Sequence, residues 1–154
     1  MKSKVSTWFE AKVAYDKIDE QGMMKTVTEL YVIEAVSFAD AEQRITEELS
    51  SYVSGEFEVR GLTKAQYGEV FFSEAETDDR WYKCKLQFIT IDEKSGKEKR
   101  TAVMYLVQAA TLNGAVKNID AAMSQLVMAD YDQANVAETK IVDVYEFRTE
   151  EAGY

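Results

Sequence analysis

Tryptophan and lysine residues alternate at the start of two similar segments, and no other arrangement in the chain is better suited to chemistry. Trp8 is followed by Lys12 in the first segment, and Trp81 is followed by Lys83 and Lys85 in the second. Side chains spaced by two or four residues share one face of a β-strand. An indole ring beside cations on an open sheet can stack a base while the cations contact phosphates. The spacing therefore predicts a surface for single-stranded nucleic acid.

A basic turn further along the chain extends this predicted surface, because its cations could continue to track a phosphate backbone. The candidate residues for binding nucleic acid or another partner are Trp8, Lys12, Trp81, Lys83, Lys85, Lys97, Lys99 and Arg100. The alternative is that each tryptophan is covered by a sheet edge, by the other segment or by a partner protein. The tryptophans and the apolar segment 70–72 would then form a homodimer or heteromeric interface. The net charge of −10 favours this alternative.

Catalytic chemistry has little support in the composition. The chain has no histidine, which removes histidine-based triads and the common zinc sites. Cys84, the single cysteine, alternates with apolar residues and is expected in the core. Asp130 and Asp132, expected on a loop, could hold Mg²⁺ with Glu138 only if these carboxylates converged near Lys140. We expect no enzymatic activity, no cofactor and no bound metal.

The composition is that of a globular protein in a reducing compartment. The chain has 154 residues, of which 46% are hydrophobic and 30% are charged, and this fits one compact domain with its own core. Its first residues lack the apolar region of a signal peptide, and no apolar run is long enough to cross a bilayer. We therefore expect a cytoplasmic protein with no membrane partner.

Self-similarity divides the chain into two copies of one module. The aligned pairs include Trp8 with Trp81, Gly22 with Gly96, Tyr31 with Tyr105, Ala41 with Ala115, and Val70 with Val144. We therefore predict a single domain over residues 1–154. It would contain two structural repeats, 8–72 and 81–147, with a short joint at 73–80.

Each copy has the pattern of a ββαβ(β) module. The hairpin turns contain Gly22 and Gly96, which can adopt the positive φ of a tight turn. Ser37 and Thr111 are expected to cap the two helices. The predicted inward stripes are Phe38, Ala41, Ile45, Leu49 and Tyr52 in one helix, and Leu112, Ala115, Ile119, Ala122 and Leu126 in the other. The closing strands are expected at 56–60, 68–72 and 141–147. The fold class is α+β, with two helices packed on mainly antiparallel sheet.

Several segments resemble the uncharacterised family of domain of unknown function 4494, which is known from Bacteroides-type gut bacteria and their phages. The segments that carry the resemblance include Trp8-Phe9-Glu10, Ser54-Gly55-Glu56-Phe57, Trp81-Tyr82-Lys83, Leu106-Val107-Gln108-Ala109 and Glu138-Thr139-Lys140-Ile141. The resemblance covers nearly the whole chain but implies no catalytic or binding residues. The occurrence in phages favours a role in nucleic-acid metabolism or host interaction.

Two functions therefore stay open at this point. The first is a small non-catalytic module that binds single-stranded nucleic acid in a phage or mobile element. The alternative is a protein–protein interaction or structural module that acts as a homodimer or within a complex.

Overall fold

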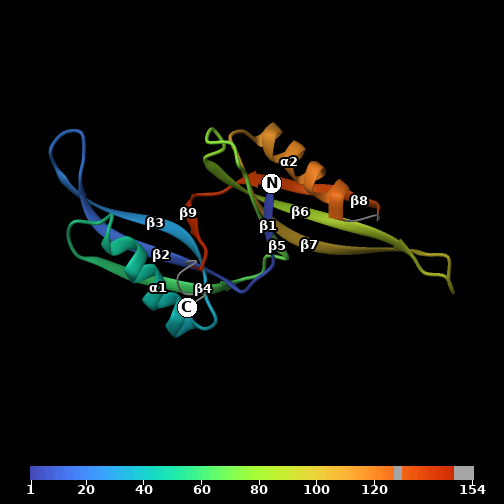
Figure 1. The fold of residues 1–154 in the computed structure, drawn as a ribbon, viewed down its shortest axis with the longest axis horizontal. Helices are drawn as coiled ribbons and strands as arrows, with labels where there is room; N and C mark the ends of the chain where they lie inside the picture. The colour runs from blue at the N-terminus through green and yellow to red at the C-terminus, as the bar shows by residue number, and fades with distance from the viewer. Residues whose placement is uncertain (127–129, 148–154) are drawn as a thin grey trace. The chain divides into compact units, whose positions relative to one another are not determined.

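The computed structural model of the chain describes residues 1–126 and 130–147. These residues form two helices and nine strands in two mixed sheets, which confirms the α+β class (Figure 1). In chain order the elements are β1 (Lys2–Lys4), β2 (Trp8–Ile18), β3 (Met24–Glu34), α1 (Phe38–Ser50), β4 (Phe57–Ala65), β5 (Glu69–Phe72), β6 (Arg80–Ile91), β7 (Glu98–Ala109), α2 (Leu112–Leu126), β8 (Asp130–Glu138) and β9 (Ile141–Tyr145).

The chain divides into two compact units. The α1 unit consists of Ser6–Ala65 with the chain from Lys140 onward, and the α2 unit consists of Met1–Val5 with Gln66–Thr139. These boundaries differ from the predicted repeats 8–72 and 81–147, because the last strand of each repeat lies in the sheet of the other. The interpretation of the chain as a single domain stays a prediction.

The sheet of the α1 unit has the order β4-β2-β3-β9. Strand β2 is antiparallel to both β3 and β4, while β9 is parallel to β3, with Val144 opposite Val32. Helix α1 covers one face of this sheet (Figure 1). The strand that closes the second repeat thus completes the sheet of the first.

The sheet of the α2 unit has the order β1-β5-β7-β6-β8. Strand β5 is parallel to β7, with Val70 opposite Leu106, and β1 is antiparallel to the outer side of β5. Strand β8 contains Asp130 and Asp132, for which the sequence predicts a loop. That expectation is wrong, because β8 pairs with β6 along almost its whole length.

The two units repeat one arrangement, so the predicted duplication is present in the structure. The order β4-β2-β3-β9 corresponds strand by strand to β8-β6-β7-β5. The pairing register shifts between Lys12 and Val13 in one unit, and between Lys85 and Leu86 in the other, which are aligned positions. Strand β1 is the addition that distinguishes the α2 unit among the described residues.

The predicted turns and helix caps are confirmed. Gly22 and Gly96 have φ angles of 79° and 69°, the left-handed region that glycine adopts without a steric penalty. The Ser37 hydroxyl accepts the Asp40 N–H at 3.1 Å. The Thr111 hydroxyl accepts the Gly114 N–H at 3.0 Å. Each contact satisfies an N–H that has no partner within its helix.

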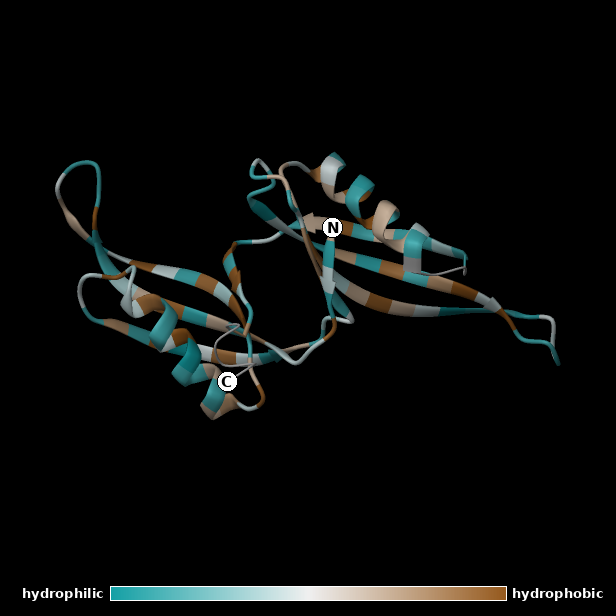
Figure 2. Cartoon of the chain, viewed as in Figure 1, coloured by the Kyte–Doolittle hydropathy of each residue, from teal (hydrophilic) through white to brown (hydrophobic). Residues whose placement is uncertain are grey.

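Apolar residues alternate with polar ones along the strands (Figure 2), and one face of each sheet packs against its helix. The inward helix positions Ala41, Ile45, Leu49, Ala115, Ile119 and Ala122 are buried as predicted. Phe38, Tyr52 and Leu112 are exposed instead, because Phe38 and Leu112 begin their helices and Tyr52 lies beyond the end of α1. The Leu126 side chain lies outside the described residues. Neither helix in the described part of the chain is long and apolar enough for a membrane crossing.

Candidate functional site

Both tryptophans of the predicted binding surface are buried. Trp8 is 1% exposed and Trp81 is 2% exposed. The ring of Trp81 meets Phe72 edge to face, with 5.4 Å between ring centroids. A base cannot stack on a ring that protein already covers, so neither indole is available for that role. This corrects the expectation of exposed rings and agrees with the alternative in which each tryptophan is covered.

The three lysines predicted beside the tryptophans lie on the faces of their sheets that no helix covers. Lys12 is exposed on β2, where its stem passes over Gly61. Lys83 and Lys85 are half-buried on the equivalent face of β6, and Lys85 lies opposite Met104. Two cations therefore share one face of the α2 unit, while Lys12 belongs to the other unit.

The cations of the basic turn do not extend that face as one group. The Arg100 guanidinium donates to Asp132 at 2.8 Å and to Glu98 at 3.2 Å, and these bonds raise its pKa further. Its charge is therefore offset by two carboxylates. Lys99 directly precedes Arg100 on β7 and therefore points to the opposite face of the sheet. Lys97 precedes the strand, in the turn.

The acidic residues weighed as a metal site are spread along β8. Asp132 and Glu138 lie about 20 Å apart on a strand that rises about 3.3 Å per residue. Asp132 pairs with Arg100, and Glu138 lies 3.5 Å from Arg80. Within residues 1–126 and 130–147, no three acidic or cysteine side chains converge as metal ligands would.

Cys84 is a core residue, as the sequence analysis expects. Its side chain is fully buried among apolar neighbours of the α2 unit. Burial, with a smaller contribution from the charge of Asp120, raises the pKa of the thiol to about 12. A nucleophilic cysteine needs a thiolate, so this side chain is unsuited to that chemistry.

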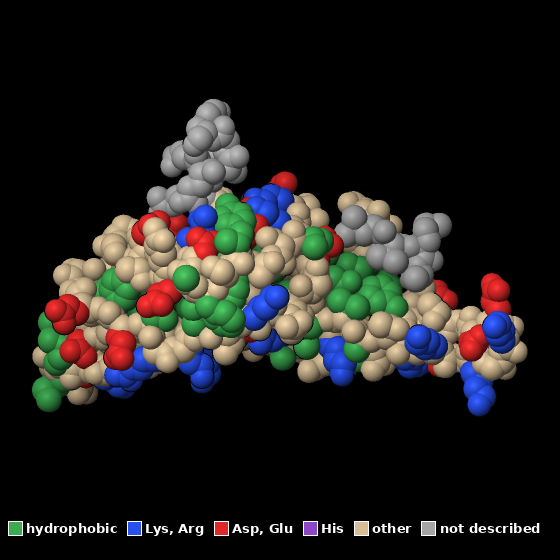
Figure 3. All heavy atoms as spheres, turned by 90° about the horizontal axis from the view of Figure 1, so that it is seen from below, with side chains coloured by type: hydrophobic (Ala, Val, Ile, Leu, Met, Phe, Trp, Pro, Cys, Tyr) green, Lys and Arg blue, Asp and Glu red, His purple; other side chains and the backbone are tan. Residues whose placement is uncertain are grey.

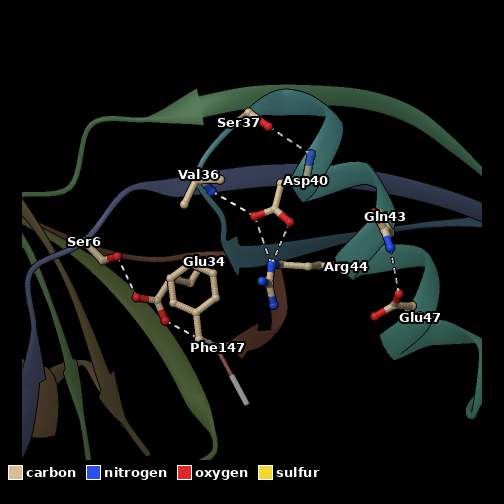
Figure 4. A network of polar contacts seen from close by, with 9 residues as sticks. All are labelled: Ser6, Glu34, Val36, Ser37, Asp40, Gln43, Arg44, Glu47 and Phe147. Carbon is tan, nitrogen blue, oxygen red and sulfur yellow. Dashed lines mark hydrogen bonds and ion pairs between the residues drawn. The ribbon is translucent and has the colours of Figure 1, made fainter. Parts of the chain in front are cut away.

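A buried carboxylate that was not predicted from the sequence holds the end of β9 in the α1 unit. Glu34 is 2% exposed and accepts the Ser6 hydroxyl at 2.6 Å and the Phe147 N–H at 2.7 Å (Figure 4). In the α2 unit the aligned Gln108 accepts the Ser73 N–H at 2.9 Å. The same kind of contact therefore holds the chain after each closing strand: a side-chain oxygen accepts a backbone N–H. The accepting residue is a glutamate in one copy and a glutamine in the other.

Arg44 of α1 reinforces this anchor. Its Nε lies 3.0 Å from both carboxylate oxygens of Asp40, which also accepts the Val36 N–H at 3.0 Å (Figure 4). Burial acts in the opposite direction, but these hydrogen bonds and the Arg44 charge lower the pKa of Asp40. The Arg44 guanidinium lies 4.4 Å from the centroid of the Phe147 ring. The helix therefore contacts the chain immediately after β9.

The helix-covered face of the α1 unit carries tyrosines around a carboxylate. The Tyr31 hydroxyl donates to Glu29 at 3.2 Å. A hydrogen bond to Glu29, followed by burial, raises the pKa of Tyr15 to about 12. The aligned residues of the α2 unit, Phe88 for Tyr15 and Val103 for Glu29, are partly buried and pack against its apolar core. The two copies therefore differ in polarity at this end of the module.

The hairpin of the α1 unit ends in exposed apolar side chains. We call Ile18, Met23, Met24 and Tyr52 the apolar end; they are 64%, 64%, 66% and 70% exposed. Ile18, Met24 and Tyr52 help to line an open hollow of about 690 Å³, together with Asp16 and Glu56. Figure 3 shows hydrophobic side chains with acidic ones beside them at its left-hand end, where this hairpin lies.

The aligned hairpin of the α2 unit has a different surface. Lys97 and Glu98 replace the two methionines, and only Ile91 keeps the exposed apolar character of Ile18. The right-hand end of Figure 3, where this hairpin lies, shows basic and acidic side chains. The apolar end is therefore not a requirement of the fold.

Comparison with known proteins gives one family. The model for a domain of unknown function, DUF4494, matches residues 7–147, which include both copies of the module. The comparisons with curated proteins and with solved structures give no match.

Proposed function

The chain belongs to the DUF4494 family, and we propose that it acts as a non-catalytic protein-interaction module. The apolar end of the α1 unit is the observation that carries this proposal. Its four side chains are each more than 60% exposed and gather at one hairpin and the loop after α1. Exposed apolar clusters of this kind mark contact surfaces in soluble proteins.

The composition of the apolar end suits a protein partner. Methionine side chains adapt their shape to irregular apolar surfaces. Tyrosine supplies a large contact area with a polar tip. The hairpin of the α2 unit holds the same turn with Lys97 and Glu98 in place of Met23 and Met24, so packing within the module does not explain the methionines.

The test compares two hairpins with the same fold. The double variant Ile18→Glu/Met24→Glu alters the apolar end, and Ile91→Glu is the matched control at the exposed aligned position of the α2 unit. Each protein is immobilised and exposed to an extract of the native host, and retained proteins are purified and measured by calorimetry. We expect the double variant to weaken binding at least about thirtyfold, because central contact residues cost about 2 kcal/mol or more.

The control should bind as the parent chain does. Equal loss of binding in both variants, or no loss in either, would remove the apolar end from the proposal. A doubled mass in light scattering that the double variant reduces to one chain would make the partner a second copy.

A second candidate is the binding of single-stranded nucleic acid, favoured by Lys83 and Lys85 on one face of β6. Fluorescence polarisation of an oligonucleotide of about 30 nucleotides, at low and moderate salt, tests it. Binding should weaken steeply with salt and in Lys85→Glu, without quenching of the buried indoles. An unbound oligonucleotide at micromolar protein and low salt would eliminate this candidate.

A further inference from the structure

The outer sides of β5 and β9 are equivalent edges of the two sheets, but only the edge of β5 is paired with a further strand among the described residues. In the α2 unit, β1 adds to this side of β5 as an antiparallel strand, with Lys4 opposite Val70 and Lys2 opposite Phe72. In the α1 unit, β9 ends the sheet, and no strand within the described ranges pairs with its outer side. The edge of β5 is thus covered by β1, whereas the equivalent strand β9 is the last strand of its sheet.

The segment of the second copy that corresponds to β1 does not cover the edge of β9. The segment that precedes β6, as β1 precedes β2, contains Ala75 and Asp78. It forms a turn in which the Asp78 N–H donates to the Ala75 carbonyl at 3.1 Å, and the Ala75 N–H donates to the Ser73 hydroxyl at 3.1 Å. A segment folded in this way within the α2 unit cannot serve as a strand beside β9.

The edge of β9 carries an exposed apolar side chain and a backbone donor that is bound by a neighbouring side chain. Val142 is 46% exposed on this strand. The Val144 N–H is bound at 2.8 Å by the carboxylate of its neighbour Asp143, so a local side chain occupies the donor that an added strand would use. Natural sheets protect exposed edges with charged side chains of this kind. An incoming strand would have to displace Asp143.

The Glu146 carboxylate favours a basic occupant at this edge. The alignment of Val70 with Val144 places Glu146 where the α2 unit has Phe72, and in that unit the Lys2 ammonium lies 5.1 Å from the Phe72 ring centroid. A cation at the position of Lys2 would therefore lie opposite a carboxylate.

We propose that the outer edge of β9 binds a short basic segment of a partner protein as an antiparallel strand, in the register in which β1 pairs with β5. Main-chain hydrogen bonds supply the affinity in such additions, and alternate side chains supply the selectivity. The site uses none of the residues of the apolar end. The two proposals can therefore be tested independently of each other.

The test is a titration of the isotope-labelled full chain with the heptapeptide MKSKVST, which copies residues 1–7, followed by amide NMR. At millimolar peptide we expect shifts at the amides of Val142, Val144 and Glu146. Glu146→Lys should lower the affinity about five- to tenfold, because an attraction between Glu146 and a lysine of the peptide becomes a repulsion. Asp143→Ala should raise the affinity, because it frees the Val144 N–H. Glu20→Lys is the charge-matched control and should change nothing.

Four results would overturn the proposal. The first is the absence of shifts along β9. The second is a set of shifts along β5 instead, which would mean that the peptide replaces β1. The third is equal binding of a peptide with both lysines changed to glutamate. The fourth is concentration-dependent broadening of the β9 amides without peptide, which would assign the edge to a second copy.

Discussion

Replacement of Glu34 by alanine should loosen the closing strand of the α1 unit. The variant removes the acceptor of the Ser6 hydroxyl at 2.6 Å and of the Phe147 N–H at 2.7 Å. Hydrogen bonds to a charged acceptor contribute about 1.5–3 kcal/mol each, and partial access of water to the freed donors reduces the sum, so we expect a loss of about 3–4 kcal/mol. Glu34→Gln should cost about 1 kcal/mol, because the amide keeps an acceptor, as Gln108 does in the other unit.

Urea unfolding measures the free energies, and hydrogen exchange at the Phe147 amide locates the effect. Protection of this amide should fall strongly in Glu34→Ala and little in Glu34→Gln, while the exposed control Glu20→Ala should match the parent chain. Equal stability of the alanine and glutamine variants would refute the reasoning. So would unchanged protection at Phe147 in Glu34→Ala.

Three further outcomes follow from local geometry. Gly68→Ala should destabilise the chain by about 1–3 kcal/mol in thermal unfolding, because a Cβ there would lie 2.6 Å from a methyl group of β7, whereas Gly55→Ala meets nothing within 4 Å and should be neutral. Cys84 should react with a thiol reagent only after denaturation, since its pKa is raised to about 12 by burial; rapid reaction of the native protein would contradict this. The pKa of Tyr15 is raised to about 12, so its contribution to stability should be complete below pH 10 and lost as pH rises towards 12. NMR titration of the tyrosine rings should show this pKa lowered in Glu29→Gln, and an unchanged value would contradict the assigned cause.

Local patterns in the sequence predicted the elements that depend on local physics. Turn glycines, helix caps and alternating apolar positions located both hairpins and both helices, since each depends on neighbouring residues. The alignment of Val70 with Val144 also identified equivalent closing strands. It could not assign them to a sheet, because a strand carries no local mark of its partner when two similar sheets are available.

The candidate site depends on burial, and that was harder to predict. Trp8 and Trp81 alternate with core residues, so their face was predicted correctly, yet alternation does not tell whether that face is covered. The anchor formed by Glu34 and Gln108 was missed because the acceptor role is shared by two residue types, and because Phe147 is distant in sequence. Strand β8 was missed because its acidic residues are uncommon in strands.

The exchange of closing strands also bears on the history of the gene. In a simple tandem duplication, either copy can be deleted and the survivor still folds. Here the loss of residues beyond Thr139 would remove a strand from the sheet built by the first copy, and the loss of the first copy would remove β5 from the sheet of the second. Each copy has become a required part of the other, so selection for folding alone is enough to preserve both while their surfaces diverge.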